Sequence, residues 1–188
     1  PFGRPGYRYR FPKPVRIYTA LEITADKRFS NNWQLAGSYV LSRLKGNYEG
    51  LFSNDNGQLD PNITSKYDIP SLLINSYGLL PNDRTHNLKL YGGYTTDFGL
   101  DVSGRFSFAS GTPISKLGAD DLYGVNEGFV ERRGTAGRTP SIWQLDLGVQ
   151  YNFKIGWSNL GVRADIFNVT NEQRTTRVDQ TYNVVDTQ

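Results

Sequence analysis

The single histidine of the chain is the first place to look for catalysis. His86 stands in the stretch DRTHNLKL, three residues after Asp83, and a histidine beside a carboxylate is a common general-base pair. The sequence contains no serine in a nucleophile elbow, and no cluster of His, Ser and carboxylate residues stands out by spacing. A surface histidine before a strand is the simpler interpretation. We therefore predict no catalytic residue and no enzyme activity.

The stretch NDNGQLDPN, residues 54–62, contains the oxygen ligands and the glycine of a calcium loop. It lacks the spacing of an EF-hand, and clusters of Asn, Asp, Gly and Pro usually form turns. The chain has no cysteine, which excludes thiolate metal sites and disulfide bonds. We predict neither a metal site nor a cofactor.

The stretch ERRGTAGR, residues 131–138, concentrates three arginines among flexible glycines. Guanidinium groups bind phosphate and carboxylate groups through paired hydrogen bonds. Arg132, Arg133 and Arg138 are therefore candidates for contact with an anionic ligand. The alternative is a charged loop tip that contacts only solvent.

The composition favours β-structure. Aromatic residues make up 13% of the 188 residues, glycine occurs 20 times, and the mean hydropathy is −0.53. No stretch approaches the roughly 20 apolar residues of a membrane-spanning helix. The net charge of +3 is small and spread along the chain, so we expect no nucleic-acid partner. Because the sequence has no methionine and no signal peptide, we expect an internal section of a longer polypeptide.

Alternating apolar and polar residues predict six long strands in an all-β, antiparallel meander. The expected strands are at about residues 15–29, 33–43, 87–96, 100–110, 143–154 and 160–170. Short turns join them in pairs at residues 30–32, 97–99 and 155–159. Long connections at about 44–86, 111–142 and 171–188 all lie at the opposite end.

Side-chain alternation also predicts the register, because facing residues must point to the same side of the sheet. The expected facing pairs are Phe29 with Trp33, Ile23 with Tyr39, Tyr94 with Val102, Leu90 with Phe106, and Phe153 with Leu160.

Two arrangements would use such strands: a soluble sandwich or a wall in a membrane. The strands of about 10 to 15 residues exceed the usual soluble length and match the 9–11 residues needed to cross a bilayer. Short turns at one end and long loops at the other are typical of outer-membrane barrels. We therefore expect Leu35, Val102 and Val149 to face acyl chains. In a sandwich, those side chains would pack on one another instead.

Charged residues on the other side of the strands should then line the barrel interior. These lumen-facing candidates are Glu22, Asp26, Arg28, Arg105, Asp146, Arg163 and Asp165. Their mixed signs argue against a simple ion-selective pore. Six strands cannot close a membrane barrel, since the smallest contain eight, so further strands are required.

Several stretches of the chain resemble the C-terminal barrel region of Oar-like TonB-dependent receptors. They are WQLAGSYVLSRLKGNYEGLFSNDNGQLDPN, YGLLPNDRTHNLKLYGGY, SGTPISKLG, YGVNEGFVERRGTAGRTPSIWQLDL and ADIFNVTNEQRTTRVDQ. The resemblance extends from about residue 15 onward and includes loops as well as strands.

The resemblance implies an incomplete section of a 22-stranded outer-membrane barrel that encloses a plug. It also implies the partners: outer-membrane lipid, a plug and barrel strands absent from this sequence, the TonB complex acting through that plug, and a transported substrate. The expected location is the bacterial outer membrane. Two alternatives remain at this stage: a secreted or cell-surface adhesin or ligand-binding β-domain, and a membrane hydrolase active at the barrel rim.

Overall fold

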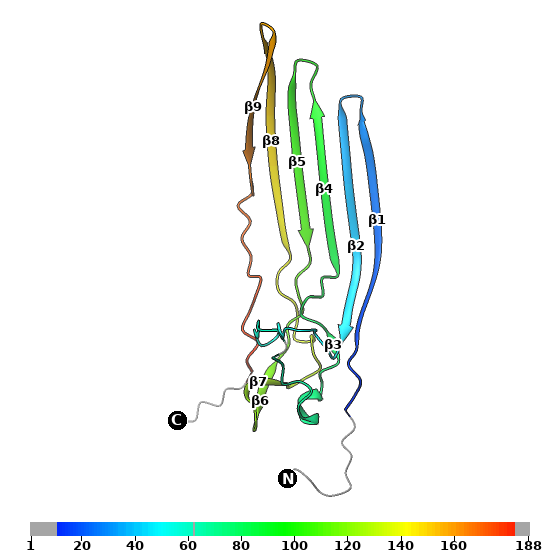
Figure 1. Cartoon of the computed structure of the whole chain (residues 1–188), viewed down its shortest axis with the longest axis vertical. Helices are drawn as coiled ribbons and strands as arrows, with labels where there is room; N and C mark the ends of the chain where they lie inside the picture. Colours follow the sequence, from blue (N-terminus) through cyan, green and yellow to red (C-terminus); the bar gives the residue numbers. More distant parts are fainter. Residues whose placement is uncertain (1–10, 62, 183–188) are drawn as a thin grey trace, which may run out of the picture.

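A computed structural model of the chain describes residues 11–61 and 63–182 (Figure 1). Its elements are β1 (Arg16–Ser30), β2 (Trp33–Gly46), the 3-10 helix η1 (Pro70–Leu73), β3 (Gly78–Leu79), β4 (His86–Thr95), β5 (Leu100–Ala109), β6 (Leu117–Asp120), β7 (Gly124–Phe129), β8 (Ile142–Ile155) and β9 (Ser158–Ile166). Among these residues no helix has the length and apolar character needed to cross a membrane.

The long strands form one antiparallel sheet in the order β1-β2-β4-β5-β8-β9, and β3 pairs with the end of β2. Strands β6 and β7 form a separate small sheet. The predicted all-β, antiparallel architecture is confirmed. In the described part of the chain the sheet does not close, so β1 and β9 are its edges.

Two strand ends differ from the prediction by three residues or more, and all others by two or fewer. Strand β2 continues to Gly46 because Lys45 and Gly46 pair with β3. Strand β9 ends at Ile166 and not near residue 170. The reason is a local turn: Asn168 has a φ of 50°, and its side-chain oxygen accepts a hydrogen bond of 3.0 Å from the backbone N–H of Glu172.

The structure confirms four of the five predicted facing pairs and corrects one. The confirmed pairs are Ile23 with Tyr39, Tyr94 with Val102, Leu90 with Phe106, and Phe153 with Leu160. Trp33 pairs with Ser30 and not with Phe29, because the register shifts between Lys27 and Ser30. The turn holds only Asn31 and Asn32, whose φ angles of 51° and 67° suit a two-residue hairpin.

Side chains of the sheet separate into two faces, which the register makes continuous across all six strands. We call apolar face the side that carries Leu21, Ile23, Leu35, Leu41, Leu88, Leu90, Val102, Phe106, Leu145, Leu147, Val149, Leu160, Val162 and Ile166. The opposite side is the polar face. Leu35, Val102 and Val149 are 44%, 39% and 42% exposed, so they do not pack inside a two-layer core.

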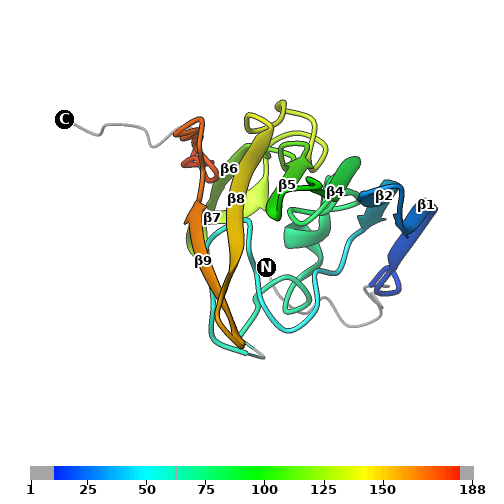
Figure 2. The same ribbon diagram turned by 90° about the horizontal axis from the view of Figure 1, so that it is seen from above.

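Viewed from above, the strands follow an arc one layer thick (Figure 2). The connection between β2 and β4, cyan to turquoise, lies on the concave side of this arc. Strand pairing alone therefore defines the sheet, and ten of the fourteen apolar-face side chains named above are exposed, while the other four are half-buried.

The core lies at one end, within the long connections. Segments 44–86, 111–142 and 171–182 together form what we call the loop body, which includes η1, β3, β6 and β7 (Figure 1). Its buried apolar side chains are Leu44, Leu72, Leu73, Leu80, Leu117 and Phe129. The sequence predicted these segments as loops; their short elements were not anticipated.

Candidate functional site

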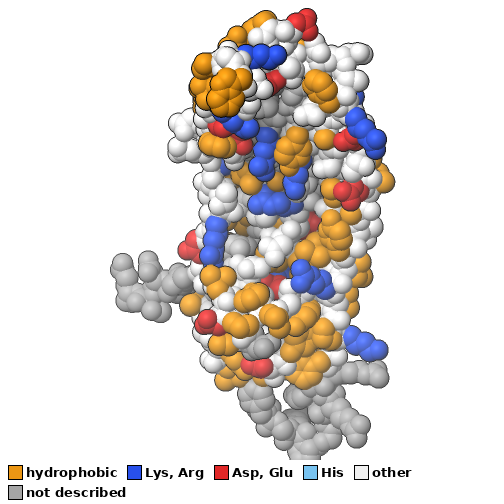
Figure 3. Space-filling model, turned by 45° about the horizontal axis from the view of Figure 1, so that its top comes forward, with side chains coloured by type: hydrophobic (Ala, Val, Ile, Leu, Met, Phe, Trp, Pro, Cys, Tyr) orange, Lys and Arg blue, Asp and Glu red, His pale blue; other side chains and the backbone are white. Residues whose placement is uncertain are grey.

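The polar face holds the residues predicted to line an interior. Regular pairing places Glu22, Asp26, Arg105, Asp146, Arg163 and Asp165 on this face. Arg28 lies within the irregular stretch between Lys27 and Ser30. Lys and Arg side chains gather along the middle of the face seen in Figure 3, with acidic groups beside them.

Two arginines of the polar face, on β5 and β9, have acidic neighbours. Arg163 binds Asp165 on its own strand, with 2.8 Å between Nε and Oδ2. Arg105 is paired in register with Asp146 and lies 5.6 Å from the ring centre of Tyr91. The face therefore presents alternating charges and amides, a surface suited to polar contacts.

Three further residues of the polar face, Asp101, Gln150 and Asn152, were not among the predicted interior residues. Asn152 donates a hydrogen bond of 2.9 Å to Asp101 on β5 and accepts one of 2.8 Å from Gln150. Residues two or four positions apart on a strand share a face, so this alternation could have identified them from the predicted residues Arg105 and Asp146.

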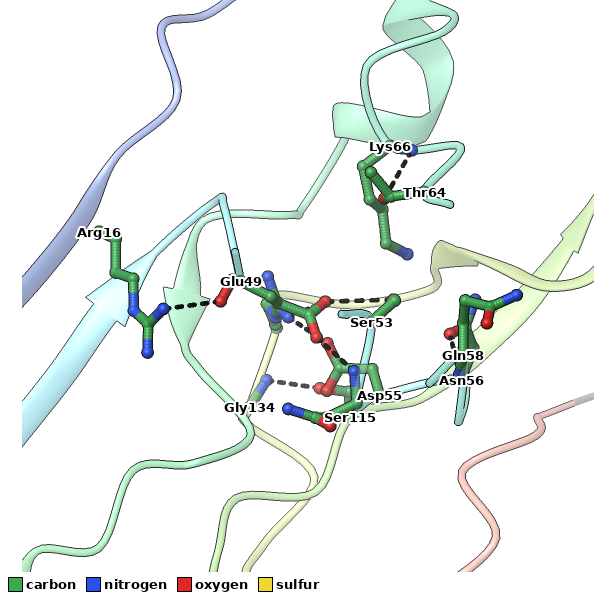
Figure 4. A network of polar contacts seen from close by, with 12 residues as sticks. Arg16, Glu49, Ser53, Asp55, Asn56, Gln58, Thr64, Lys66, Ser115 and Gly134 are labelled. Atoms are coloured by element: carbon green, nitrogen blue, oxygen red, sulfur yellow. Dashed lines mark hydrogen bonds and ion pairs between the residues drawn. The ribbon is translucent and has the colours of Figure 1, made fainter. Parts of the chain in front are cut away.

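The second candidate region is a buried charged cluster in the loop body (Figure 4). Arg133 is 1% exposed, and its Nη2 contacts both the Glu49 and Asp55 carboxylates. Lys66, also buried, donates a hydrogen bond of 3.0 Å to the Glu127 carbonyl. Two cations thus face two carboxylates out of contact with water.

Aromatic packing and backbone bonds hold this cluster together. The ring of Phe129 lies 5.1 Å from the Arg133 guanidinium carbon and 4.4 Å from Lys66 Nζ, distances typical of cation–π contacts. The other Glu49 oxygen accepts a hydrogen bond of 2.7 Å from the Asn54 N–H. Most charged groups therefore have specific partners, as buried ions require.

Burial changes the protonation of the cluster. It raises the pKa of Asp55 to about 6, although nearby Arg133 opposes the change. Burial likewise lowers the pKa of Lys66, because the charged amine loses its hydration.

Contacts from the third segment complete the loop body. The Gln180 side chain accepts a hydrogen bond of 2.6 Å from the Ser115 N–H and donates one of 3.2 Å to the Asp55 carbonyl. Leu117 and Thr181 form a parallel bridge. Residues far apart in sequence, from three connections, are therefore fixed relative to one another.

The three arginines proposed for ligand contact have different surroundings. Arg133 is buried among carboxylates of its own chain, so the expectation that it contacts an external ligand does not fit the structure. Arg138 pairs with buried Asp83 and donates a hydrogen bond of 2.8 Å to the Gly111 carbonyl. Arg132 is exposed and donates one of 3.3 Å to the Tyr77 carbonyl. Arg132 and Arg138 are both exposed, whereas Arg133 is enclosed.

The structure separates the two residues that suggested general-base chemistry. The Asp83 carboxylate accepts a hydrogen bond of 2.5 Å from the Leu44 N–H and binds Arg138. His86 instead lies with its Nδ1 2.8 Å from the Tyr39 hydroxyl and stacks on that ring. The geometry therefore holds both residues in structural contacts.

The stretch considered as a calcium loop is a turn in its described residues. Ser53 bridges to Gln58, Gly57 has a φ of 81°, and Asp55 faces Arg133. Asn62 lies outside the described residues. Within the described ranges, no group of three or more His, Cys, Asp or Glu side chains could hold a metal ion.

An open pocket of about 370 Å³ lies where the three segments of the loop body meet. Its wall is mostly polar and comprises Asp55, Asn56, Leu117, Asn126, Arg177, Val178, Asp179, Gln180 and Thr181. The buried Oδ1 of Asn126 has no hydrogen-bond partner in the described structure. This surface could accept a small polar group.

Comparison with known proteins finds one informative relative. Over 191 aligned positions the chain is 40% identical to the TonB-dependent transporter Oar of Myxococcus xanthus, and the alignment covers 98% of this chain. The chain spans 18% of the length of that curated relative. The resemblance to Oar-like TonB-dependent receptors is thus confirmed, and the relative is a TonB-dependent transporter. No family model and no solved structure matches the chain.

Proposed function

We propose, with the similarity to a TonB-dependent transporter as the premise, that this chain is part of an outer-membrane receptor of that kind. Its sheet would form barrel wall, its polar face would line the interior, and its loop body would form part of the external recognition surface. No catalytic role is proposed.

The observation that carries this proposal is the uncovered apolar face. Fourteen of its aliphatic and aromatic residues are named above, and the charged residues of the regular strands lie mostly on the other side. An apolar sheet surface of this extent has a natural partner in acyl chains. Aromatic residues near both strand ends, such as Tyr151 with Phe153 and Phe106 with Trp143, suit the two membrane interfaces.

The edges of the sheet support a larger barrel. Unpaired backbone groups within lipid cost several kcal/mol each, so β1 and β9 need further strands beside them. The proposed partners are therefore outer-membrane lipid, additional strands and a plug of the same receptor, and the TonB complex acting through that plug. A transported substrate would meet the loop body first, at Arg132 and at the pocket lined by Asn126.

This chain contains no cysteine, so a cysteine introduced here is its only labelling site once any cysteine elsewhere in the full-length protein is replaced. In the full-length protein that contains this chain, single cysteines replace Val102, Ser103, Val149 or Gln150. Val102 and Val149 are on the apolar face, whereas Ser103 and Gln150 are their sequence neighbours on the polar face. After reconstitution into phospholipid vesicles, a nitroxide label at each cysteine reports exposure to oxygen in the bilayer or to a water-soluble nickel complex.

We expect oxygen to relax the labels at 102 and 149, and the nickel complex to relax those at 103 and 150. Equal exposure of all four labels to the nickel complex would contradict the proposal, since a water-soluble adhesin would give that result. Burial of positions 102 and 149 from both reagents would indicate a protein core instead.

A further inference from the structure

The charges on the apolar face are few and all of one sign. On the six long strands, only three charged residues point to the apolar face by strand alternation: Lys27, Arg43 and Lys45. The acidic residues of the six strands, including Glu22, Asp26, Asp101, Asp146 and Asp165, alternate to the polar face. This face therefore has cations at its ends and no carboxylate to neutralise them.

Two of these cations lie together where the apolar face meets the loop body. Arg43 and Lys45 are two residues apart on β2, so both side chains point to the same side of the strand. Arg43 pairs in register with Thr19, and Lys45 pairs with Ile17 on one side and Leu79 on the other. These three register partners are neutral.

A groove of about 520 Å³ runs beside this pair. Leu21, Leu41 and Leu79 provide its apolar lining, and Arg43 and Arg138 provide its charges. Arg138 is already paired with Asp83. None of the ion pairs found among the described residues involves Arg43 or Lys45.

Lys27, near the opposite end of the sheet, has a different environment. Its Nζ donates hydrogen bonds of 2.9 and 3.0 Å to the carbonyls of Ser30 and Trp33, and lies 3.8 Å from the centre of the Trp33 ring. The fold itself therefore satisfies Lys27. It leaves the charges of Arg43 and Lys45 available to an external anion.

We propose that Arg43 and Lys45 bind the phosphate of an anionic membrane lipid whose acyl chains lie on the groove of Leu21, Leu41 and Leu79. This lipid site rests on the proposed function, in which the apolar face lies in the membrane. An amphipathic lipid matches both parts of the surface, since its phosphate complements the cations and its chains complement the leucines. An acidic protein partner would match only the cations.

The test uses the full-length protein in nanodiscs of phosphatidylcholine with or without phosphatidylglycerol. Native mass spectrometry after release from the discs gives the ratio of anionic to zwitterionic lipid that stays bound. Each cation near an anionic surface contributes about fivefold to binding, so the double variant Arg43→Gln, Lys45→Gln should lower the preference for phosphatidylglycerol roughly 25-fold. The matched control Lys27→Gln should leave the ratio unchanged.

Two further variants guard against misfolding. Exchange of the two cations, Arg43→Lys with Lys45→Arg, keeps the charge and should keep the preference. Thr19→Glu leaves both cations in place but adds a carboxylate opposite Arg43, and should reduce the preference severalfold. An unchanged preference in Thr19→Glu and in the double variant would overturn the inference, as would an equal loss in Lys27→Gln.

Two other outcomes separate the inference from its premise. If 10 mM inorganic phosphate displaces the bound lipid completely, the site is one for free anions and the inference is wrong. If the wild-type protein does not enter nanodiscs, the proposed function fails. If it enters them without preference for phosphatidylglycerol, only the lipid site fails.

Discussion

The sheet and the loop body are held together by different physical means. In the sheet, regular backbone pairing joins six strands, while side chains such as Leu35 and Val149 remain exposed. In the loop body, the backbone is irregular, but residues from two of the three connections are buried against one another, and Gln180 of the third is hydrogen-bonded to both. Burial of side chains in this chain therefore does not follow regular secondary structure. The uncovered sheet depends on its surroundings, whereas the loop body supplies its own interior.

That interior is unusually polar. The buried side chains of the described residues include six apolar ones and ten polar or charged ones, among them Asp55, Lys66, Asp83 and Arg133. Such a core depends on partner-specific contacts, because a buried charge without its partner is strongly destabilising. Single substitutions should therefore act very differently in the two regions.

The largest effect should come from Arg133→Met. This change leaves the Glu49 and Asp55 carboxylates buried without their shared guanidinium, and removing one partner of a buried ion pair costs about 3–5 kcal/mol. We expect the loop body to open while the sheet persists. Hydrogen exchange followed by mass spectrometry should show lost protection in segments 44–86 and 111–142 and unchanged protection in β4 and β5.

Arg132→Met is the matched control, since Arg132 is the exposed neighbour of Arg133. It should change hydrogen exchange little. Similar effects of the two substitutions would mean that the buried cluster does not hold the loop body together. Loss of protection in β4 and β5 as well would show that the two regions unfold as one unit.

The next largest effect concerns the sheet. Leu147 lies on the apolar face near the middle of the strands, and a lysine at the bilayer midplane costs about 2–4 kcal/mol. Leu147→Lys should therefore reduce the stability of the full-length protein in phospholipid vesicles by that amount. Urea titration monitored by tryptophan fluorescence measures it.

Gln150→Lys provides the comparison on the polar face of the same strand. A water-filled interior tolerates the added charge, so the change in stability should stay within about 0.5 kcal/mol. If the two lysines destabilise the protein equally, the apolar face does not contact lipid.

The contrast also explains how much of the structure could be predicted from sequence. Alternation with a period of two is a local signal, so the six long strands and pairs such as Leu90 with Phe106 followed directly from it. The shift at Phe29 was missed because both Asn31 and Asn32 adopt positive φ, which shortened the turn by one residue. An Asn-Asn pair was the available signal.

The buried cluster gave no such local pattern. Glu49, Asp55, Lys66 and Arg133 come from two connections, and their partners are up to 84 positions apart. Charged residues, glycine and proline are typical of exposed loops, so the sequence ERRGTAGR predicts a surface segment. Only the tertiary arrangement reveals that its second arginine is enclosed.

A smaller effect is expected where backbones approach closely in the loop body. A Cβ added at Gly78 would lie 2.0 Å from the Arg133 carbonyl oxygen, whereas one at Gly128 would meet nothing within 4 Å. Gly78→Ala should therefore destabilise the loop body by about 1–3 kcal/mol, the usual cost of overpacking. Thermal unfolding with hydrogen exchange as the readout measures the change.

Gly128→Ala is the control and should leave the protection of the loop body close to that of the wild type. If Gly78→Ala is equally harmless, the contact between β3 and the Arg133 backbone is loose. The loop body would then be less closely packed than its buried residues indicate.

The smallest effect should be a dependence of the loop body on pH. Burial raises the pKa of Asp55 from an ordinary value of 3.8 to about 6, so between these values the folded state binds a proton that the unfolded chain has released. The stability contributed by this group is therefore complete below pH 4 and is lost as the pH rises through 6. The free energy of opening of the loop-body segments, measured by hydrogen exchange, should fall by on the order of 1–2 kcal/mol between pH 4.5 and 7.

The substitution Asp55→Asn should abolish this dependence on pH. The substitution of exposed Asp121 by Asn should preserve it, because of these two residues only Asp55 shares Arg133 with a second carboxylate. A slope that survives in Asp55→Asn would show that Asp55 is not the titrating group, and would leave the loop body's polar core without its proposed proton site.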